Sequence, residues 1–572
     1  MDVPHDDKDV REDDIEIREG SRKDFVRRSA VHMGLAWAAR HESALALGLS
    51  GLLVWVAQFH HFRDLGLYED DYFFIAEAMG KSPDYLLTRL QTAVTVLPQG
   101  RPLGFFLPDL LSFIGDKLGG LAAIYLLGFV LVTCNTYLCY RLLRVRLPVA
   151  PAAVGSAVFC LFPADTTKIL LTHDFQLQPS LTFALVAALA YAADRRPLAY
   201  VLGAGALLSY ENGYLALFAL PLFVKRWDGS LPRALLMHVV ALLGVLGVVV
   251  LARVARGEGR ATGFVGGPGE IVPAFLGSLV LGPARSSAAM FYGPLKAIPG
   301  WDAETLILAC VAGIAFMALL LSSARPGSAS RQRREALKIG AAGVAMLVLA
   351  YALAFTHFPP NAVVGRGTSV HLGATLGMSV IAASVAWLLL SLRPRLATAA
   401  ISVYLALAVG YYVTIERDFI RSWQLQRGFW QQVVACCSDV QDGTVLLYEL
   451  TLADEPTTFI FTNSWADPLV LGEVFAFPTD WANPPRLFSL TQWLDRVQPE
   501  GDHLRWWVPG AAWDEHWEVL PQGNVILLRR APDGGLTRVT GSLDVAGQAL
   551  QLKTPAAPVP WPAAQLYEPL LK

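Results

Sequence analysis

The chain has 572 residues, of which 54% are hydrophobic and only 16% are charged, and its mean hydropathy is +0.42. This composition excludes an ordinary soluble globular protein and indicates an integral membrane protein, with the lipid bilayer as its surroundings. The formal net charge of −2 gives no sign of a nucleic-acid-binding surface, so we expect no nucleic acid among the partners.

Residues 1–42 are rich in charged side chains and poor in aromatic ones, which predicts a disordered, solvated cytoplasmic tail. A polytopic α-helical membrane domain follows over residues 43–415, because apolar runs approaching the roughly 20 residues of a span recur there. The stretches 148–163 and 197–210 are short for a full crossing. We predict about eleven transmembrane helices, at 43–62, 120–143, 148–163, 178–193, 197–210, 212–224, 234–252, 303–322, 337–356, 371–391 and 396–415.

Basic residues lie in or beside every second connection between the predicted transmembrane helices, as the positive-inside rule requires of cytoplasmic loops. They are Arg27, Arg28, Arg141, Arg144, Arg146, Arg195, Arg196, Lys225, Arg226, Arg325, Arg331, Arg333, Arg334, Arg393 and Arg395. We therefore expect a cytoplasmic N-terminus and an extracytoplasmic C-terminus. Extracytoplasmic loops are then expected at 63–119, 164–177, 253–302 and 357–370, with an interfacial or re-entrant segment at 272–282.

Composition becomes soluble in character after about residue 416, which predicts an extracytoplasmic domain over 416–572 of α/β or β-rich type. Residues 444–450 and 524–530 are predicted strands, and Asp533, Gly534 and Gly535 suit a hairpin turn. Exposed tryptophans stack on sugar rings, whereas buried ones fill a core, and the sequence leaves both roles open. The tryptophans concerned are Trp465, Trp481, Trp506, Trp507, Trp513 and Trp517.

An acidic cluster lies just past the first predicted span, in Glu69, Asp70 and Asp71. Carboxylates at a membrane surface point to a function, because ionised groups are costly near hydrocarbon. The alternative is an N-cap for the helix that begins there. If the cluster is catalytic, Asp70 or Asp71 is expected to be a general base, and Asp71 is favoured. Repulsion between the neighbouring carboxylates is expected to raise their pKa values.

Further polar residues lie in the predicted extracytoplasmic loops, and we expect three of these loops to converge on one cleft. Glu211 lies instead between two short apolar runs, where we expect it to face the same cleft. A carboxylate there would activate an acceptor hydroxyl, and a cation would stabilise a leaving phosphate. The alternatives are snorkelling for Arg101, an ordinary loop charge for Arg366 and a polar turn for Glu211. Tyr412 is expected to be an interface anchor. The candidate substrate-binding residues are Glu69, Arg101, Asp165, Lys168, His173, Asp174, Glu211 and Arg366.

Over residues 43–391 the chain resembles the GT-C superfamily of membrane glycosyltransferases, such as protein O-mannosyltransferases, the lipid A aminoarabinose transferase and oligosaccharyltransferases. The resemblance rests on the acidic pair after the first span, the first loop with Gly100-Arg101-Pro102-Leu103, and the acidic residues of the second loop. It implies inverting transfer from a polyprenyl-phosphate or polyprenyl-diphosphate sugar, with Asp70 or Asp71 as base.

The resemblance also bears on metals, because some relatives bind a divalent cation through a second-loop acidic motif. Here Asp165 and Asp174 are separated rather than set in a tight pair, and no metal-ligand spacing emerges from cysteines and histidines.

We expect an inner-membrane glycosyltransferase of bacterial type that acts on an extracytoplasmic glycan, lipid or protein. The alternatives are a transporter or flippase for a lipid-linked glycan, an O-antigen ligase or polymerase, and a non-enzymatic scaffold.

Overall fold

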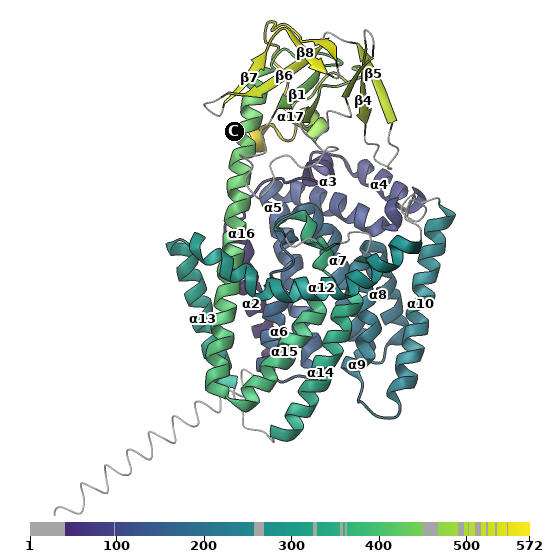
Figure 1. Cartoon of the computed structure of the whole chain (residues 1–572), viewed down its shortest axis with the longest axis vertical. Coiled ribbons are helices and arrows are strands. Elements are labelled where there is room, and N and C mark those ends of the chain that lie inside the picture. Colours follow the sequence, from purple (N-terminus) through teal and green to yellow (C-terminus); the bar gives the residue numbers. More distant parts are fainter. Residues whose placement is uncertain are drawn as a thin grey trace, which may run out of the picture.

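The computed structural model describes residues 41–96, 98–256, 268–323, 329–354, 359–360, 363–449, 467–489, 497–500, 503–508, 516–521, 524–531, 535–545 and 547–572. The predicted tail lies outside these residues except for His41 and Glu42, as do Asp533 and Gly534 of the predicted turn. A long helical bundle carries a small β-containing region at one end (Figure 1). The prediction of a helical membrane protein with a C-terminal β-containing region is confirmed.

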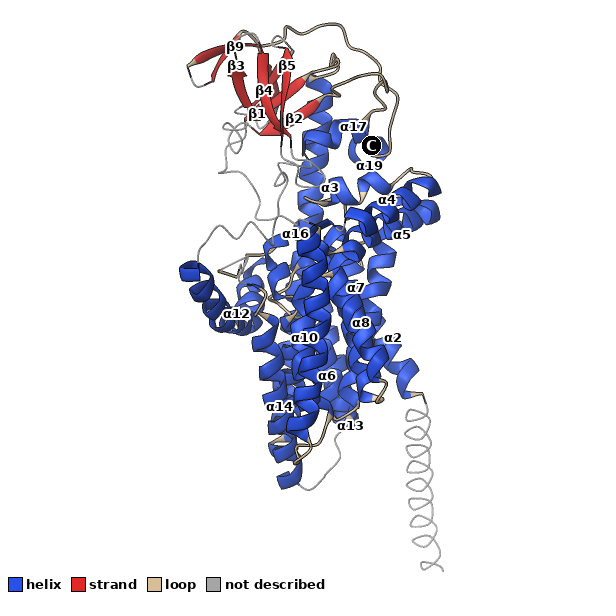
Figure 2. Ribbon diagram, turned by 90° about the vertical axis from the view of Figure 1, so that its right-hand side faces the viewer, coloured by secondary structure: helices blue, strands red, loops and turns tan. Residues whose placement is uncertain are grey.

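Helices form most of the described chain (Figure 2). Each predicted span range overlaps one helix or two consecutive ones. In chain order they are α2 (Glu42–Val54), η1 (Trp55–Phe59), α3 (Asp71–Phe74), η2 (Ala76–Ala78), α4 (Pro83–Val96), η3 (Pro98–Gly100), α5 (Pro102–Arg144), α6 (Val149–Cys160), η4 (Thr167–Ile169), α7 (Leu171–Ala192), α8 (Arg196–Ser209), η5 (Glu211–Ala219), α9 (Leu220–Val224), α10 (Leu231–Ala255), α12 (Pro268–Ala297), η6 (Ile298–Gly300), α13 (Ala303–Ser323), α14 (Ala329–Ala350), η8 (Arg366–His371), α15 (Ala374–Leu392) and α16 (Pro394–Cys436).

Eight helices of the described chain are long and apolar enough to cross a membrane. The stretches 149–160 and 211–224 are apolar but shorter, α8 has only 14 residues, and α14 is long but less apolar. The count of about eleven crossings therefore stays a prediction.

The helix α5 is two helices joined at a break. Gly120 has φ +68°, a left-handed conformation that favours glycine, and it separates an N-terminal half from the predicted span 120–143. The N-terminal half begins with Pro102 at the first helical turn, where the missing amide N–H costs nothing. Together with α3 and α4 it forms the helical part of the first loop.

The helix α12 runs across the bundle rather than along it (Figure 1). It has the length and composition of a span, yet Val272, Leu276 and Val280 stay exposed along it. A crosswise apolar helix is the arrangement expected of an interfacial segment. The predicted segment 272–282 is thus one part of a helix of 30 residues.

Basic residues from connections far apart in the sequence gather at one end of the bundle. Arg144 pairs with Glu42 at 2.6 Å, and Arg146 pairs with Glu335 at 3.0 Å. Arg146 also donates to the carbonyl oxygen of Lys225 at 2.9 Å. The grouping agrees with the charge pattern of the sequence, while the side of the membrane that it faces remains a prediction.

The C-terminal region combines parallel and antiparallel strands, as the α/β prediction allows. The helix α16 continues through residue 415, the predicted boundary, and leads into this region. Strands β1 (Val445–Glu449) and β6 (Val525–Arg530) match both predicted strands. One sheet has the order β2-β1-β6-β7, with β2 (Arg486–Ser489) and β6 parallel to β1 and β7 (Leu536–Val539) antiparallel to β6.

The remaining strands pair only with sequence neighbours. Antiparallel pairing joins three strands in one sheet and two in another. The described part of this region also contains short α-helices and a 3₁₀ turn. These elements are β3 (Val497–Glu500), β4 (His503–Val508), β5 (His516–Pro521), β8 (Ser542–Val545), β9 (Gln548–Gln551), η10 (Asp467–Leu469), α17 (Val470–Val474) and α19 (Tyr567–Leu571).

The C-terminal region contacts the first loop directly. Gln565 Nε2 donates to the carbonyl oxygen of Ala76 at 3.4 Å, and the Tyr72 hydroxyl bonds Gln426 of α16. Figure 1 shows α17 above α3 and α4. The first loop and the C-terminal region therefore share one end of the bundle.

Gly66 lies where the first loop crosses α16. A Cβ atom at this position would come within 1.8 Å of the Trp423 ring, which is itself buried. We expect Gly66→Ala to lower the free energy of unfolding by about 1–3 kcal/mol, because the ring cannot move without disturbing its neighbours. Thermal unfolding in detergent measures the change.

The matched control is Gly48→Ala, because Gly48 on α2 has open space where a Cβ atom would stand. Its melting temperature is expected to equal or exceed that of the wild type, since alanine favours a helix. Equal melting temperatures for the two variants would contradict the packing described here.

Candidate functional site

Three hydrogen bonds between tyrosine hydroxyls and backbone groups hold the segment before the acidic cluster in place. The Tyr68 hydroxyl donates to the carbonyl oxygen of Phe419 on α16 at 2.9 Å and accepts from the Gly66 N–H at 3.1 Å. The Tyr125 hydroxyl on α5 donates to the Gly66 carbonyl oxygen at 2.5 Å. These bonds fix where the next residues leave the bundle.

Asp71 is fully buried, and both of its carboxylate oxygens accept backbone hydrogen bonds. Oδ2 accepts the Tyr68 N–H at 3.1 Å, and Oδ1 accepts the Thr172 N–H of α7 at 2.7 Å. Burial raises the pKa of Asp71 to about 7; the Thr172 and Tyr68 hydrogen bonds oppose this shift, and the charge of Asp70 adds to it. The predicted repulsion within the cluster is therefore a smaller cause than burial. Through these two hydrogen bonds, Asp71 links the first loop to α7.

Asp70 has a different environment from its neighbour. It occupies the N-cap position of α3, but its side chain makes no capping hydrogen bond. Its Oδ1 instead lies 3.4 Å from Nη1 of Arg366, whose side chain is 40% exposed. Capping alone therefore does not explain this carboxylate.

Glu69 precedes the pair in a left-handed backbone conformation, with φ +49°. A non-glycine residue rarely adopts this conformation, and such residues cluster at functional sites. The side chain of Glu69 is buried, with 7% of the residue exposed. The turn at Glu69 sets the direction in which Asp70 and Asp71 follow.

The second predicted extracytoplasmic loop (164–177) and the last one (357–370) meet beside Asp70 and Asp71. The hydroxyl groups of Thr166 and Thr368 lie 3.0 Å apart, and the Thr166 N–H donates to the Thr368 hydroxyl at 3.0 Å. His173, which is nearly buried at the start of α7, is within electrostatic reach of Arg366. The first, second and last loops are thus in contact, as expected from the sequence, while a cleft between them stays a prediction.

Lys168 is buried beneath these loops and contacts a tyrosine of α16. Its Nζ donates to the Cys160 carbonyl oxygen and to the Tyr412 hydroxyl, each at 2.9 Å. Burial lowers the pKa of Lys168, against the charge of Asp165, which raises it. Tyr412 is also buried and donates to the Asp165 carbonyl oxygen at 2.6 Å. The prediction of an interface anchor at Tyr412 is wrong, because this side chain organises the second loop from inside.

Two buried carboxylates near Lys168 keep oxygen atoms without a hydrogen-bond partner in the described chain. Asp165 Oδ1 accepts from the Thr167 N–H and hydroxyl, but Oδ2 has no such partner, and neither does either oxygen of Asp174. Asp174 lies within electrostatic reach of Lys168, Asp165 and Asp71. Gly128 on α5 leaves room for it, since a Cβ there would stand 2.5 Å from Asp174 Oδ2. These buried oxygens are therefore exceptions to the rule that buried polar groups are hydrogen-bonded.

A divalent cation does not find a ready set of ligands among these aspartates. In the described part of the chain, one group of metal-binding side chains brings its ligand atoms within 4.8 Å of one another, and it lies elsewhere, at His60, His61 and Glu304.

Arg101 and Glu211 form a second polar centre at the start of α5 and η5. Arg101 donates to both carboxylate oxygens of Glu211, through Nε at 2.7 Å and through Nη2. Its guanidinium also lies 4.0 Å from the centre of the Tyr210 ring. Arg253 approaches Glu211 to 3.7 Å. Arg101 is thus engaged by protein groups, and this differs from both a snorkelling arginine and an open phosphate site.

Several charged residues of the first loop escaped the sequence analysis. Asp109 of α5 accepts from Arg89 Nε of α4 at 2.8 Å and from the Tyr85 hydroxyl at 3.2 Å. Arg89 also approaches Glu77 to 3.8 Å. These contacts clamp α4 onto α5.

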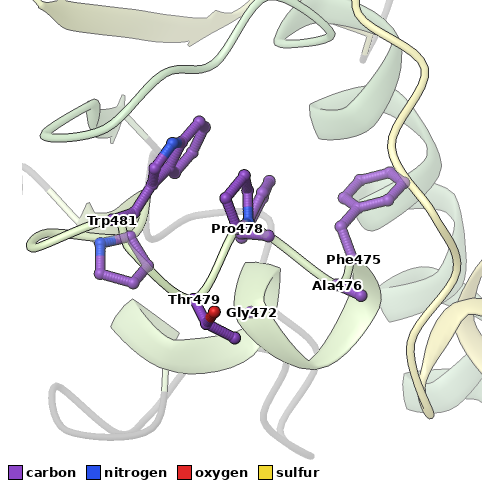
Figure 3. A pocket seen from close by; sticks show the side chains of 8 residues that line it. Gly472, Phe475, Ala476, Pro478, Thr479 and Trp481 are labelled. Carbon is purple, nitrogen blue, oxygen red and sulfur yellow. The ribbon is translucent and has the colours of Figure 1, made fainter.

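A pocket of about 280 Å³ lies in the C-terminal region (Figure 3). Phe475, Phe477, Thr479 and Trp481 are among its lining residues. Trp481 stacks on Phe477 at 5.4 Å between ring centres, with 13° between the ring planes. The aromatic walls make this pocket suitable for a flat apolar face, such as that of a sugar ring.

The predicted tryptophans have different settings. Trp517 on β5 is 37% exposed, with Arg505 5.1 Å from its ring centre, and Trp481 is half-buried at the pocket. Trp465 and Trp513, together with the side chains of Trp506 and Trp507, lie outside the described residues.

Comparison with known proteins adds no relative to these observations. No protein-family model matches the chain, and neither a curated protein nor a solved structure matches it.

The burial of Asp71 predicts how stability varies with pH. A native pKa of about 7 exceeds the ordinary value of about 3.9, so the native state binds more protons than the unfolded state between these values. The contribution of Asp71 to stability therefore falls as pH rises from about 4 to about 7. Melting temperatures of the wild type and Asp71→Asn at pH 5 and pH 8 measure it.

At pH 5 the wild type is expected to be the more stable protein, because an asparagine offers one acceptor oxygen to two backbone N–H donors. The difference should shrink at pH 8. Asp84→Asn, at an exposed position of α4, is the control for loss of a carboxylate. A difference that stays constant between the two pH values for Asp71→Asn would contradict the burial of a titrating carboxyl here.

Proposed function

We propose that the protein is a membrane glycosyltransferase that takes a sugar from a polyprenyl-phosphate or polyprenyl-diphosphate donor. The observation that carries the proposal is the pairing of Asp70 with Arg366, an acid and a half-exposed cation contributed by the first and last loops. Support comes from the helical first loop at the same end of the bundle as the C-terminal region. The GT-C-like architecture, with about eleven crossings, belongs to the same proposal.

Asp70 is the base in this proposal, in place of Asp71. Both oxygens of Asp71 are occupied by backbone N–H groups and the side chain has no exposed surface, whereas Asp70 contacts a residue that reaches solvent. A base must come within hydrogen-bond distance of the proton that it removes. Asp71 is then a positioning residue that holds the loop against α7.

The reaction is a single displacement. The acceptor hydroxyl oxygen forms a bond to the anomeric carbon as the bond from that carbon to the phosphate oxygen breaks. The leaving phosphate keeps the electron pair of the broken bond, and the hydroxyl proton passes to Asp70. Arg366 binds the phosphate with its guanidinium, whose planar fork matches phosphate oxygens. Inversion at the anomeric carbon follows from one displacement.

The second loop supplies the wall of the site in this proposal. Lys168 stays beneath it, held by Tyr412, and His173 stands beside Arg366. Asp165 and Asp174 are buried close to Lys168 and support this wall from beneath. Arg101 and Glu211 brace α5 against the end of α8, and Glu69 fixes the turn that presents Asp70.

The end of the bundle that carries Asp70 is extracytoplasmic in this proposal, and the membrane is the inner membrane of a bacterium. The acceptor is a glycan, a lipid or a protein outside the cytoplasm. The charge pattern supports this orientation, because the basic connections gather at the opposite end.

Asp70→Asn is expected to lower the rate of sugar transfer by about 10²- to 10⁴-fold, because an amide cannot take up the proton of the attacking hydroxyl group. Transfer of a labelled sugar from a polyprenyl-phosphate donor, in membranes with matched protein abundance, measures the loss. Asp84→Asn is the matched control, since it removes an exposed carboxylate from the same loop.

Transfer by the control at the wild-type rate is part of the expected result. Equal rates for Asp70→Asn and the wild type would exclude Asp70 as the base. If the wild type transfers no sugar from a panel of lipid-linked donors but moves one across the bilayer, the transporter alternative replaces this proposal.

The aromatic pocket of the C-terminal region binds the acceptor in this account. Trp481→Ala is expected to raise KM for the acceptor with little change in kcat, because the ring contributes binding away from the reacting atoms. Trp517→Ala is the matched control, an exposed tryptophan on β5 that does not line the pocket. Steady-state transfer rates against acceptor concentration give both constants.

A fall in kcat without a change in KM for Trp481→Ala, or the same KM for Trp481→Ala and Trp517→Ala, would remove the pocket from the account. The role of Asp70 does not depend on this outcome, since the two sites are tested by different variants.

A further inference from the structure

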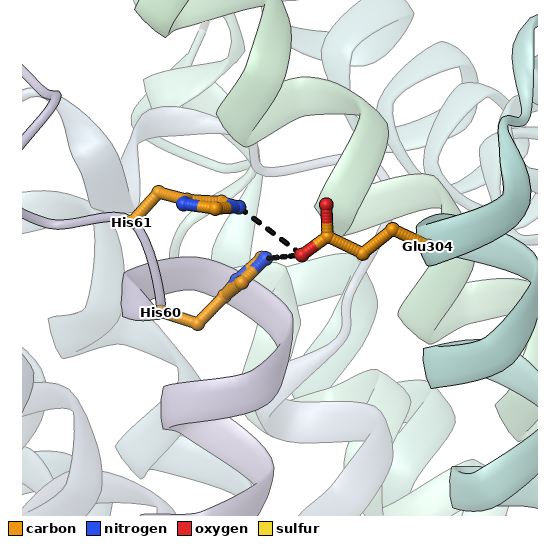
Figure 4. A group of neighbouring side chains, drawn as sticks. All are labelled: His60, His61 and Glu304. Carbon is orange, nitrogen blue, oxygen red and sulfur yellow. Dashed lines mark hydrogen bonds and ion pairs between the residues drawn. The ribbon is translucent and has the colours of Figure 1, made fainter.

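Two adjacent histidines and a distant glutamate converge at the end of the first helix (Figure 4). His60 and His61 directly follow η1, a π-helical turn, and Glu304 stands in the first turn of α13. Single π-helical turns are frequent at functional sites. His61 Nε2 lies 3.2 Å from Glu304 Oε1, and His60 Nε2 lies 3.5 Å from the same oxygen.

These separations fit a single transition-metal ion. Zinc–nitrogen and zinc–oxygen bonds are about 2.0–2.2 Å long, so ligand atoms around a tetrahedral zinc stand about 3.3 Å apart. All three ligand atoms lie within 4.8 Å of one another. Both histidines present the same ring nitrogen, Nε2, toward the shared oxygen.

A charged side chain lies on the opposite side of each group. His60 Nδ1 lies 2.6 Å from Oε2 of the fully buried Glu416, and His61 Nδ1 lies 3.6 Å from Asp64 Oδ2. Arg417 binds the other oxygen of Glu304, Oε2, at 2.6 Å. A carboxylate thus stands behind each histidine, as at many zinc sites, although neither contact has the geometry of a hydrogen bond.

The convergence of both rings on one oxygen goes beyond a single ion pair. The two rings stand 4.2 Å apart between centres, and His61 Nε2 is within hydrogen-bond distance of Glu304 Oε1. A metal ion bound to both Nε2 atoms would take the place of this hydrogen bond. The cluster is also accessible, because the His61 and Glu304 side chains are 34% and 45% exposed.

We propose that His60, His61 and Glu304 form a binding site for a divalent transition-metal ion, with zinc as the preferred ion. Two imidazole nitrogens and one carboxylate oxygen suit zinc better than magnesium or calcium, which prefer oxygen ligands. The exposed side leaves a coordination position for water. The ion would join the end of the first helix to α13, close to Glu416 and Arg417 of α16, and so fix the start of the loop that leads to Asp70.

Zinc binding to the full chain in detergent tests the proposal. The protein is stripped with a chelator and then titrated with zinc alone, in competition with a chromophoric chelator. We expect the wild type to bind about one ion per chain, and Glu304→Gln and His61→Ala to weaken binding by about 100-fold or more, at or beyond the upper end of losses from outer-shell changes. Cobalt in place of zinc reports the coordination number by its absorption spectrum.

The matched control is Asp302→Asn. Asp302 lies two residues before Glu304, pairs with the same Arg417 and caps α13 through the Thr305 N–H at 2.9 Å. Asparagine keeps the cap and removes the charge, so zinc binding should match the wild type. Size-exclusion chromatography confirms that each variant is folded, and the cobalt spectrum of the wild type stands as a test that needs no variant.

Three results would overturn the proposal. The wild type binds no zinc, or the cobalt spectrum is that of the hydrated ion, or Asp302→Asn loses as much affinity as Glu304→Gln. The last result would show that the negative charge of this surface, rather than the three ligands, attracts the ion. None of these measurements depends on sugar transfer.

Discussion

The arrangement of the candidate site depends on one buried carboxylate. Asp71 accepts backbone N–H groups from Tyr68 on one side and from Thr172 of α7 on the other, with no exposed surface. Burying a carboxylate is unfavourable unless its oxygens are hydrogen-bonded, so the two bonds hold the first loop in place. Its neighbour Asp70 is then turned toward Arg366. In the proposed mechanism, positioning and chemistry therefore fall to adjacent residues.

The same end of the bundle collects segments that are distant in the sequence. The first loop packs under the C-terminal region through Gln565 and Ala76, and the second and last loops join through Thr166 and Thr368. Glu304 of α13 meets the histidines that begin the first loop. An enzyme that handles a lipid-linked substrate needs polar groups at a membrane surface, and rigid helices to hold them. The proposed transfer and the proposed metal site both use this end.

Much of the fold could be predicted from the sequence, because apolar runs, basic connections and short alternating strands are local signals. The approximate positions of the predicted spans and of strands β1 and β6 follow from them, whereas α4 and the N-terminal half of α5 lie in a predicted loop. The different surroundings of Asp70 and Asp71 could not be predicted, since they depend on the backbone turn at Glu69. The burial of Tyr412 and the meeting of His60 with Glu304 also depend on packing between distant helices, which no local pattern records.

The central claim is that the convergence of loops around Asp70 and Arg366 is the donor site. A structure of the protein in a lipid nanodisc with a bound polyprenyl phosphate tests it most directly. The account predicts the phosphate within hydrogen-bond distance of the Arg366 guanidinium, with the Asp70 carboxylate facing the same space. A phosphate bound at the basic end of the bundle, beside Arg144 and Arg146, would contradict it.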